Sequence, residues 1–295
     1  MTDRAARPDP RRIVVGLPPT DAGSAALAWA ARLAASTEVE LIGISALEQD
    51  VPLSARRVGE VTARRNAELD SWITPGQLSG APLTIELEFG DPRVVLSATA
   101  KDHRVEALVV GRQGPGSRPG VLHLGSVAEY LAHHVSIPLA VIPSGTASDV
   151  RRMVVGVDGS EASRAAVSWC ARLAGLTGAS VVAVQVHEPF LEWTPETDLP
   201  AWHAAAEQSI REDLAAELVT AGVELSPVAV RGARPADGLL RVVDGHGADL
   251  LVVGMRGLGG FSGLRIGGVA IDVLHRSEVA VALIPGAPGA SADAG

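Results

Sequence analysis

The chain has 295 residues, of which 47% are hydrophobic and 20% charged, and this length predicts two globular domains. Its 34 acidic and 25 basic residues give a net charge of −9, which opposes sequence-independent binding of nucleic acid, because such binding depends on neutralising phosphates. No apolar run reaches the roughly 18 residues that a membrane span needs, and the polar start has no apolar signal core. We therefore expect a cytoplasmic protein that binds neither nucleic acid nor membranes.

Short apolar runs alternate with helical segments along the chain. In the first half we predict strands at 13–17, 39–46, 83–88, 105–110 and 138–142, and helices at 21–36, 56–73, 92–101 and 125–134. In the second half we predict strands at 152–157, 180–186, 224–230, 249–253 and 279–284, and helices at 161–177, 200–221, 235–246 and 267–276. Strands that are apolar throughout and separated by helices predict an α/β fold, with a doubly wound, Rossmann-like, five-stranded parallel sheet in each half.

The two halves are related by an internal repeat. Segment 11–17 returns as 151–157, and 28–34 as 168–174; later, 107–111 matches 250–254, and 137–143 matches 279–285. Matches in the same order predict tandem domains over residues 1–146 and 147–295, with a disordered tail from Gly286.

The last predicted strand of each half is uncharged and apolar. In a doubly wound unit such a strand lies at an exposed sheet edge, which invites pairing with another strand. We therefore expect the halves to pair edge to edge as an internal pseudo-dimer, and whole chains to form a homodimer.

A glycine-rich loop follows the fourth strand of the second half. Residues 254–269 contain seven glycines in sixteen positions, and successive backbone N–H groups in such a loop can surround an anion. The helix that opens at Gly267 adds its positive end, while Arg256 and Arg265 can add charge-assisted bonds. A flexible surface loop without a ligand is the alternative. The loop is not a Walker A motif, because it lacks Gly-Lys-Ser/Thr.

The loop after the first strand is the second candidate. In the second half, residues 156–160 place Asp158 where it can lie at the rim of a nucleotide pocket, near ribose or a metal; a plain helix cap is the equally weighted alternative. In the first half Pro18 replaces this acidic residue, and we expect Asp21 to cap the helix.

These residues resemble the universal stress protein family in its tandem form, over about 11–143 and 151–285. The family signature after strand four is Gly-x2-Gly-x9-Gly-Ser/Thr. The second half has Gly254, Gly257 and Gly267 at this spacing, but Gly268 stands where Ser or Thr is usual. The first half keeps the hydroxyl at Ser126, with one residue inserted before Gly125.

The resemblance implies ATP binding and a role in stress adaptation or signalling, with little or no turnover. It places the adenine contact at the end of strand two, and Asp158 near ribose, phosphate or Mg²⁺. A slow ATP hydrolase or nucleotide transferase, and a nucleotide-free dimeric interaction module with an unknown protein partner, remain alternatives. We expect the second site to be the stronger. Its residues would be Gly156, Val157, Asp158, Gly159, Val186, Gly254, Arg256, Gly257, Gly259, Gly260, Gly267, Gly268 and Val269; those of the first would be Gly16, Gly111, Gly114, Gly116, Gly125, Ser126 and Val127.

Overall fold

A computed structural model describes residues 11–37, 39–48, 54–113, 124–146, 149–188, 199–258 and 265–286. Four glycines of the predicted sites lie outside these residues: Gly114, Gly116, Gly259 and Gly260. The tail after Gly286, which we expected to be disordered, also lies outside them.

Each half alternates strands with helices, as the sequence predicts. The strands of the first half are β1 (Arg12–Gly16), β2 (Glu40–Leu47), β3 (Leu83–Phe89), β4 (Val105–Gly111) and β5 (Leu139–Ile142), and its helices are α1 (Asp21–Ala35), α2 (Ala55–Trp72), α3 (Pro75–Leu78), α4 (Pro92–Thr99) and α5 (Ser126–His134). The strands of the second half are β6 (Arg152–Gly156), β7 (Ser180–His187), β8 (Leu225–Arg231), β9 (Leu250–Gly254) and β10 (Ala280–Ile284). Its helices are α6 (Glu161–Thr177), α7 (Leu199–Ser209), η1 (Ile210–Leu214), α8 (Ala216–Thr220), α9 (Pro235–His246) and α10 (Gly268–Arg276).

The prediction of one continuous helix over 200–221 is wrong. A π-helical turn, η1, interrupts it, and the Ala215 N–H donates to the Ile210 carbonyl at 2.8 Å. The extra residue in this turn brings Ile210, Ala215 and Leu218 onto one buried face, although their spacing does not fit a regular α-helix. Burial of these three side chains therefore decides the local geometry.

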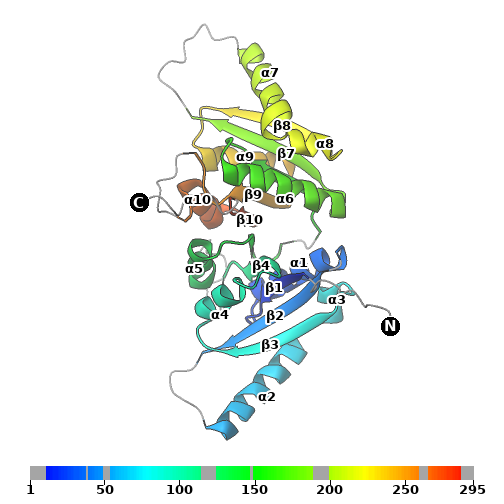
Figure 1. Ribbon diagram of the computed structural model, residues 1–295, viewed down its shortest axis with the longest axis vertical. Coiled ribbons are helices and arrows are strands. Elements are labelled where there is room, and N and C mark those ends of the chain that lie inside the picture. Colours follow the sequence, from blue (N-terminus) through cyan, green and yellow to red (C-terminus); the bar gives the residue numbers. More distant parts are fainter. Residues whose placement is uncertain are drawn as a thin grey trace, which may run out of the picture.

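The ten strands of the described residues form one sheet, in the order β3-β2-β1-β4-β5-β10-β9-β6-β7-β8. Neighbours within each half are parallel, whereas β5 and β10 pair antiparallel, with Val141 opposite Val281 and Leu139 opposite Leu283. The expected edge-to-edge pairing of the halves is therefore confirmed. In Figure 1 the first half lies below and the second above, with β10 and α10 facing the first half at mid-height.

Alternating strand residues supply two cores that run through both halves. Side chains such as Ile13 and Val15 pack on the α1 and α6 face, while Val14 and Val154 pack on the face covered by α4, α5, α9 and α10. Helices thus cover both faces of the sheet, as continuous apolar strands require.

Gly111 and Gly254, at the ends of β4 and β9, are needed for close packing of the helix that follows strand one. A Cβ at Gly254 would lie 2.8 Å from the backbone carbonyl carbon of Ala162, near the start of α6. A Cβ at Gly111 would lie 2.7 Å from the same atom of Ala22 in α1. The missing side chain at both positions therefore has a packing reason of its own.

We expect Gly254→Ala to lower the free energy of unfolding by about 1–3 kcal/mol through overpacking, measured by urea denaturation. Gly268→Ala is the matched control, because a Cβ there meets nothing within 4 Å. Equal stability losses in the two variants would contradict the packing role of Gly254.

Candidate functional site

The parallel strands β6, β7 and β9 of the second half end at one edge of the sheet. Strands β6 and β9 are neighbours, while the chain runs from β6 outward to β7 and β8 before it returns through α9 to β9. The strand order therefore reverses between β6 and β9, and ligands of doubly wound sheets bind at such a point. The loops that begin after Gly156 and Gly254 lie at this point.

Asp158 joins these two loops. One oxygen of its carboxylate accepts the Ser160 N–H at 2.9 Å, and the other accepts the Leu258 N–H at 3.1 Å. The Ser160 hydroxyl also donates to the Arg256 carbonyl at 3.3 Å. The sequence predicted Asp158 but gave no role to Ser160 or Leu258 in holding the loops together.

The carboxylate of Asp158 is held in its ionised form. Burial opposes ionisation, but the hydrogen bonds from Ser160, Leu258 and Ser163 outweigh it and lower the pKa of Asp158 below its usual value. A fixed negative charge therefore lies where the two loops meet.

Because the pKa of Asp158 is lower in the folded state, its stabilising effect is complete above the unfolded-state pKa of about 3.9 and is lost as the pH falls through the folded-state pKa. Asp158 is exposed to solvent as a residue, so we expect only about 1 kcal/mol from these bonds. Asp158→Asn should thus be less stable than the wild type by about 1 kcal/mol at pH 7. Thermal unfolding across pH should show this difference shrinking below about pH 4. A difference independent of pH would contradict the assignment.

The helix that follows the glycine loop begins without a side-chain cap. The N-cap residue of α10 is Gly267, whose own N–H donates to the Met255 carbonyl at 2.7 Å and so returns the chain to the start of the loop. By contrast, the Ser160 hydroxyl caps α6 by accepting the Ser163 N–H at 3.1 Å. Among the described residues, no side chain thus accepts from the first N–H groups of α10, and such an end favours an anion.

The other predicted residues of the second site have identifiable local roles. Gly159 has φ +81°, which favours glycine, and a Cβ at Gly257 would lie 2.5 Å from Oδ2 of Asp158. A Cβ at Gly156 would lie 3.2 Å from Leu239 of α9. Val157 is buried, with its N–H bonded to the Val184 carbonyl at 2.9 Å. A substitution such as Gly257→Val would therefore displace Asp158 as well as fill the space of the loop.

The end of β7 supplies an aromatic pair that the sequence did not reveal. The side chain of Val186 points toward Gly238 of α9. His187, one residue later, packs edge-on against Trp202 of α7, with ring centroids 4.9 Å apart. Burial lowers the pKa of His187, so its ring is neutral at pH 7, and its buried Nε2 has no hydrogen-bond partner in the described structure. The His187–Trp202 pair therefore lies at the end of β7, where the sequence predicts the adenine contact.

The first half repeats this layout incompletely. The helix α5 begins at Ser126 after Gly125, and the Gly125 N–H donates to the Arg112 carbonyl at 2.8 Å. Pro18 stands in place of Asp158, so no carboxylate joins the loops. The expectation that Asp21 caps α1 is wrong, because the Thr20 hydroxyl accepts the Gly23 N–H at 3.1 Å and Asp21 is the first helical residue.

Gly16 and Val127 of the first half have packing contacts. A Cβ at Gly16 would lie 3.2 Å from Leu96 of α4. Val127, in α5, packs against the core on the same face of the sheet. Val269, the counterpart of Val127 in α10, is 36% exposed.

Two arginines that flank the glycine loops point to the opposite half. Arg265, which we expected to face phosphate, donates to the His134 carbonyl at the end of α5 at 3.2 Å. Arg112 donates to the His275 and Ser277 carbonyls at the end of α10. Each arginine thus places positive charge at a helix C-terminus, which favours cations. The guanidinium of Arg256 is exposed and makes no bond within the described residues.

No cluster of three or more His, Cys, Asp or Glu side chains that could hold a metal occurs in the described part of the chain. A cation at this site would therefore depend on Asp158 and on oxygens of a bound ligand. Among the same residues, no helix has both the length and the apolar character to cross a membrane.

The fold and the site define an α/β protein with two doubly wound units and one glycine-rich loop at the carboxyl edge of each. The family model described as "Universal stress protein family" matches residues 10–143 and 149–285. The chain therefore belongs to the universal stress protein family, with two copies of the domain in tandem.

Relatives and solved structures agree with this assignment. Universal stress protein Rv2623 of Mycobacterium tuberculosis is 30% identical over 289 residues, which is 92% of this chain and 95% of the relative. A universal stress protein from Archaeoglobus fulgidus aligns with 93% of this chain and 98% of its own, at a TM-score of 0.70 and 16% identity. A universal stress protein solved in complex with cAMP aligns with 47% of this chain and 98% of its own, at 28% identity and a TM-score of 0.37.

Proposed function

We propose that the second half binds ATP at the carboxyl ends of β6, β7 and β9, and that the protein acts in stress adaptation or signalling. The observation that carries this proposal is the uncapped N-terminus of α10, which follows a glycine-rich loop at the point where the strand order reverses. The phosphates would lie against the N–H groups of Gly268 and Val269. The adenine would lie near Val186 and the His187–Trp202 pair.

The carboxylate of Asp158 indicates that a cation binds together with the nucleotide. A carboxylate beside a triphosphate is repulsive unless a cation lies between them. Mg²⁺ is commonly held by one or two carboxylates together with phosphate oxygens and waters, so Asp158 can contribute one ligand without an all-protein metal site. We therefore propose that ATP binds with Mg²⁺, and that affinity falls when Mg²⁺ is removed.

The same carboxylate argues for binding with little turnover. An effective general base has a pKa near the working pH, whereas the hydrogen bonds to Asp158 lower its pKa below the usual value. Asp158 is therefore a weak base. Slow ATP hydrolysis is the second candidate function, and magnesium-dependent turnover that disappears in Asp158→Ala would favour it.

Equilibrium titration of the purified chain with ATP, with and without Mg²⁺, tests the proposal. We expect saturable binding of one ATP in the second site at a concentration where the first site remains largely empty. Chromatography of the denatured protein would identify any nucleotide that copurifies. If no nucleotide copurifies and ATP does not bind saturably, the chain is an interaction module without nucleotide.

The first half is proposed to bind nucleotide more weakly. It keeps the uncapped start of α5 and the hydroxyl of Ser126, but Pro18 replaces the carboxylate that would help to hold Mg²⁺.

We propose that whole chains pair into a homodimer, which sedimentation analysis would test.

A further inference from the structure

Helices α1 and α6 are equivalent in the internal repeat, and each carries an arginine near its C-terminal end. Arg32 in the last turns of α1 and Arg172 in the corresponding turns of α6 occupy the same position of the repeat, 140 residues apart. The two arginines would have the same surroundings if the repeat were exact, but their partners differ.

Arg32 binds a carboxylate from the linker between the halves. The Arg32 guanidinium donates to Asp149, and this bond and charge raise the pKa of Arg32 and lower that of Asp149. Nη2 of Arg151 lies 3.7 Å from Oδ2, the other carboxylate oxygen of Asp149. The linker residue Val150 packs against the core. An arginine at this position of the fold therefore binds a carboxylate that is followed by an apolar group.

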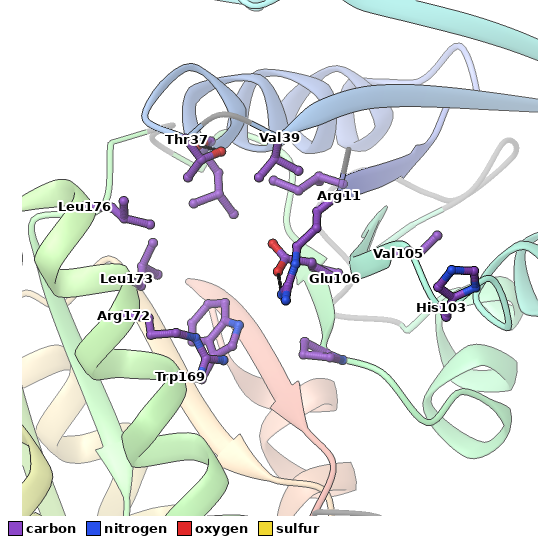
Figure 2. A pocket seen from close by; sticks show the side chains of 14 residues that line it. Arg11, Thr37, Val39, His103, Val105, Glu106, Trp169, Arg172, Leu173 and Leu176 are labelled. Carbon is purple, nitrogen blue, oxygen red and sulfur yellow. Dashed lines mark hydrogen bonds and ion pairs between the residues drawn. The ribbon is translucent and has the colours of Figure 1, made fainter. Parts of the chain in front are cut away.

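Arg172 lies beside a groove that holds no equivalent of Asp149 among the described residues. Arg172 makes no hydrogen bond or ion pair with any residue that the structure describes. A cavity of about 320 Å³ lies beside it, between α6 and the starts of β1 and β4. Figure 2 shows Trp169, Arg172 and Leu173 of α6 on one side of this cavity, and Val39 and the Arg11–Glu106 ion pair on the other.

The lining of the cavity combines positive charge with apolar walls. The lining contains two arginines, Arg11 and Arg172, and one carboxylate, Glu106, so the cavity carries a net charge of about +1. The net charge of the whole chain is −9. Trp169 is partly exposed here, whereas its counterpart Trp29 is 2% exposed. Among the described residues, the walls thus offer a guanidinium without a partner beside partly exposed apolar side chains.

We propose that this groove binds a small carboxylate with an apolar body, such as a medium-chain fatty acid. Arg172 binds the carboxylate as Arg32 binds that of Asp149, and Trp169 and Leu173 cover the apolar body. The groove opens at the starts of the strands, on the edge opposite the proposed nucleotide site. Binding here is therefore independent of the proposed function.

Titration calorimetry with octanoate tests this proposal on the full chain. We expect one octanoate per chain and no saturable binding of 1-octanol, which has the same body without the charge. Arg172→Gln should weaken octanoate binding at least tenfold and leave ATP binding unchanged. Arg32→Gln is the matched control, and it should change octanoate affinity less than twofold.

Three results would overturn the proposal. The first is the absence of saturable octanoate binding to the wild type, and the second is equal affinity in Arg172→Gln. The third concerns the chain's own sequence, in which Asp9 precedes Arg11 as Asp149 precedes Arg151. If octanoate binds to Asp9→Asn and not to the wild type, the carboxylate for Arg172 comes from the chain itself.

Discussion

Replacing Arg112 with alanine is expected to lower the free energy of unfolding by about 2–4 kcal/mol, because it removes hydrogen bonds from a charged group and leaves a cavity at the junction of the halves. Arg112 lies at the end of β4 in the first half and is 3% exposed. Its guanidinium donates to the His275 and Ser277 carbonyls, and this contact places a cation at the C-terminus of α10. Urea denaturation at neutral pH would measure the change.

Two control variants separate the contributions of Arg112. Arg265→Ala removes the equivalent contact to α5, but the residue is exposed and its single bond to the His134 carbonyl is 3.2 Å long, so we expect a loss below about 1 kcal/mol. Arg112→Met copies Met255, the buried residue at the same position of the second half. It should restore the packing but not the hydrogen bonds. A stability equal to the wild type in Arg112→Met would show that these hydrogen bonds contribute nothing net.

Gly268→Asp is expected to weaken ATP binding by about 100-fold, or roughly 2.7 kcal/mol, because a carboxylate would occupy the place proposed for the phosphates. Gly268 is the first residue of α10, and a Cβ there meets nothing within 4 Å. An acidic residue in the first turn of a helix is stabilising by about 0.3–1 kcal/mol, so the fold should be unchanged or slightly more stable. Loss of ATP binding without loss of stability would separate the site from the fold.

Ser126→Asp is the matched control for Gly268→Asp, because Ser126 is the first residue of α5. We expect it to leave the stronger ATP site unchanged. If Gly268→Asp retains wild-type affinity, the phosphates do not lie at the start of α10. If Ser126→Asp abolishes the stronger binding instead, the order of the two sites is reversed.

The sequence predicted most of the fold because the cores are simple. Apolar strands and helical segments repeat with nearly constant spacing, so the number of strands and their order along the chain followed from local pattern alone. The edge-to-edge pairing of the halves was predicted because the last strand of each half is uncharged, and charged side chains are a common means by which an exposed edge strand avoids pairing. The π turn at η1 could not be predicted, since it depends on which side chains of that helix reach the core.

The candidate site was predicted in part. Asp158 and the glycines are visible as motif residues, whereas the partners that hold Asp158 are backbone N–H groups, which carry no sequence signal. Gly254 and Gly111 appeared as ligand glycines, but their Cβ positions lie against the helix after strand one. Arg265 was expected to face phosphate because it lies in the glycine loop, yet it donates to the other half.

The sequence by itself determined the tandem repeat and the doubly wound class, because these depend on periodicity and on the order of segments. Only the tertiary structure decided what the repeated residues contact. Arg32 and Arg172 are equivalent in sequence, but the linker approaches one and not the other. Arg112 and Met255 are equivalent as well, but only Arg112 reaches across to a helix end. Such differences arise from contacts between distant segments, which no local pattern encodes.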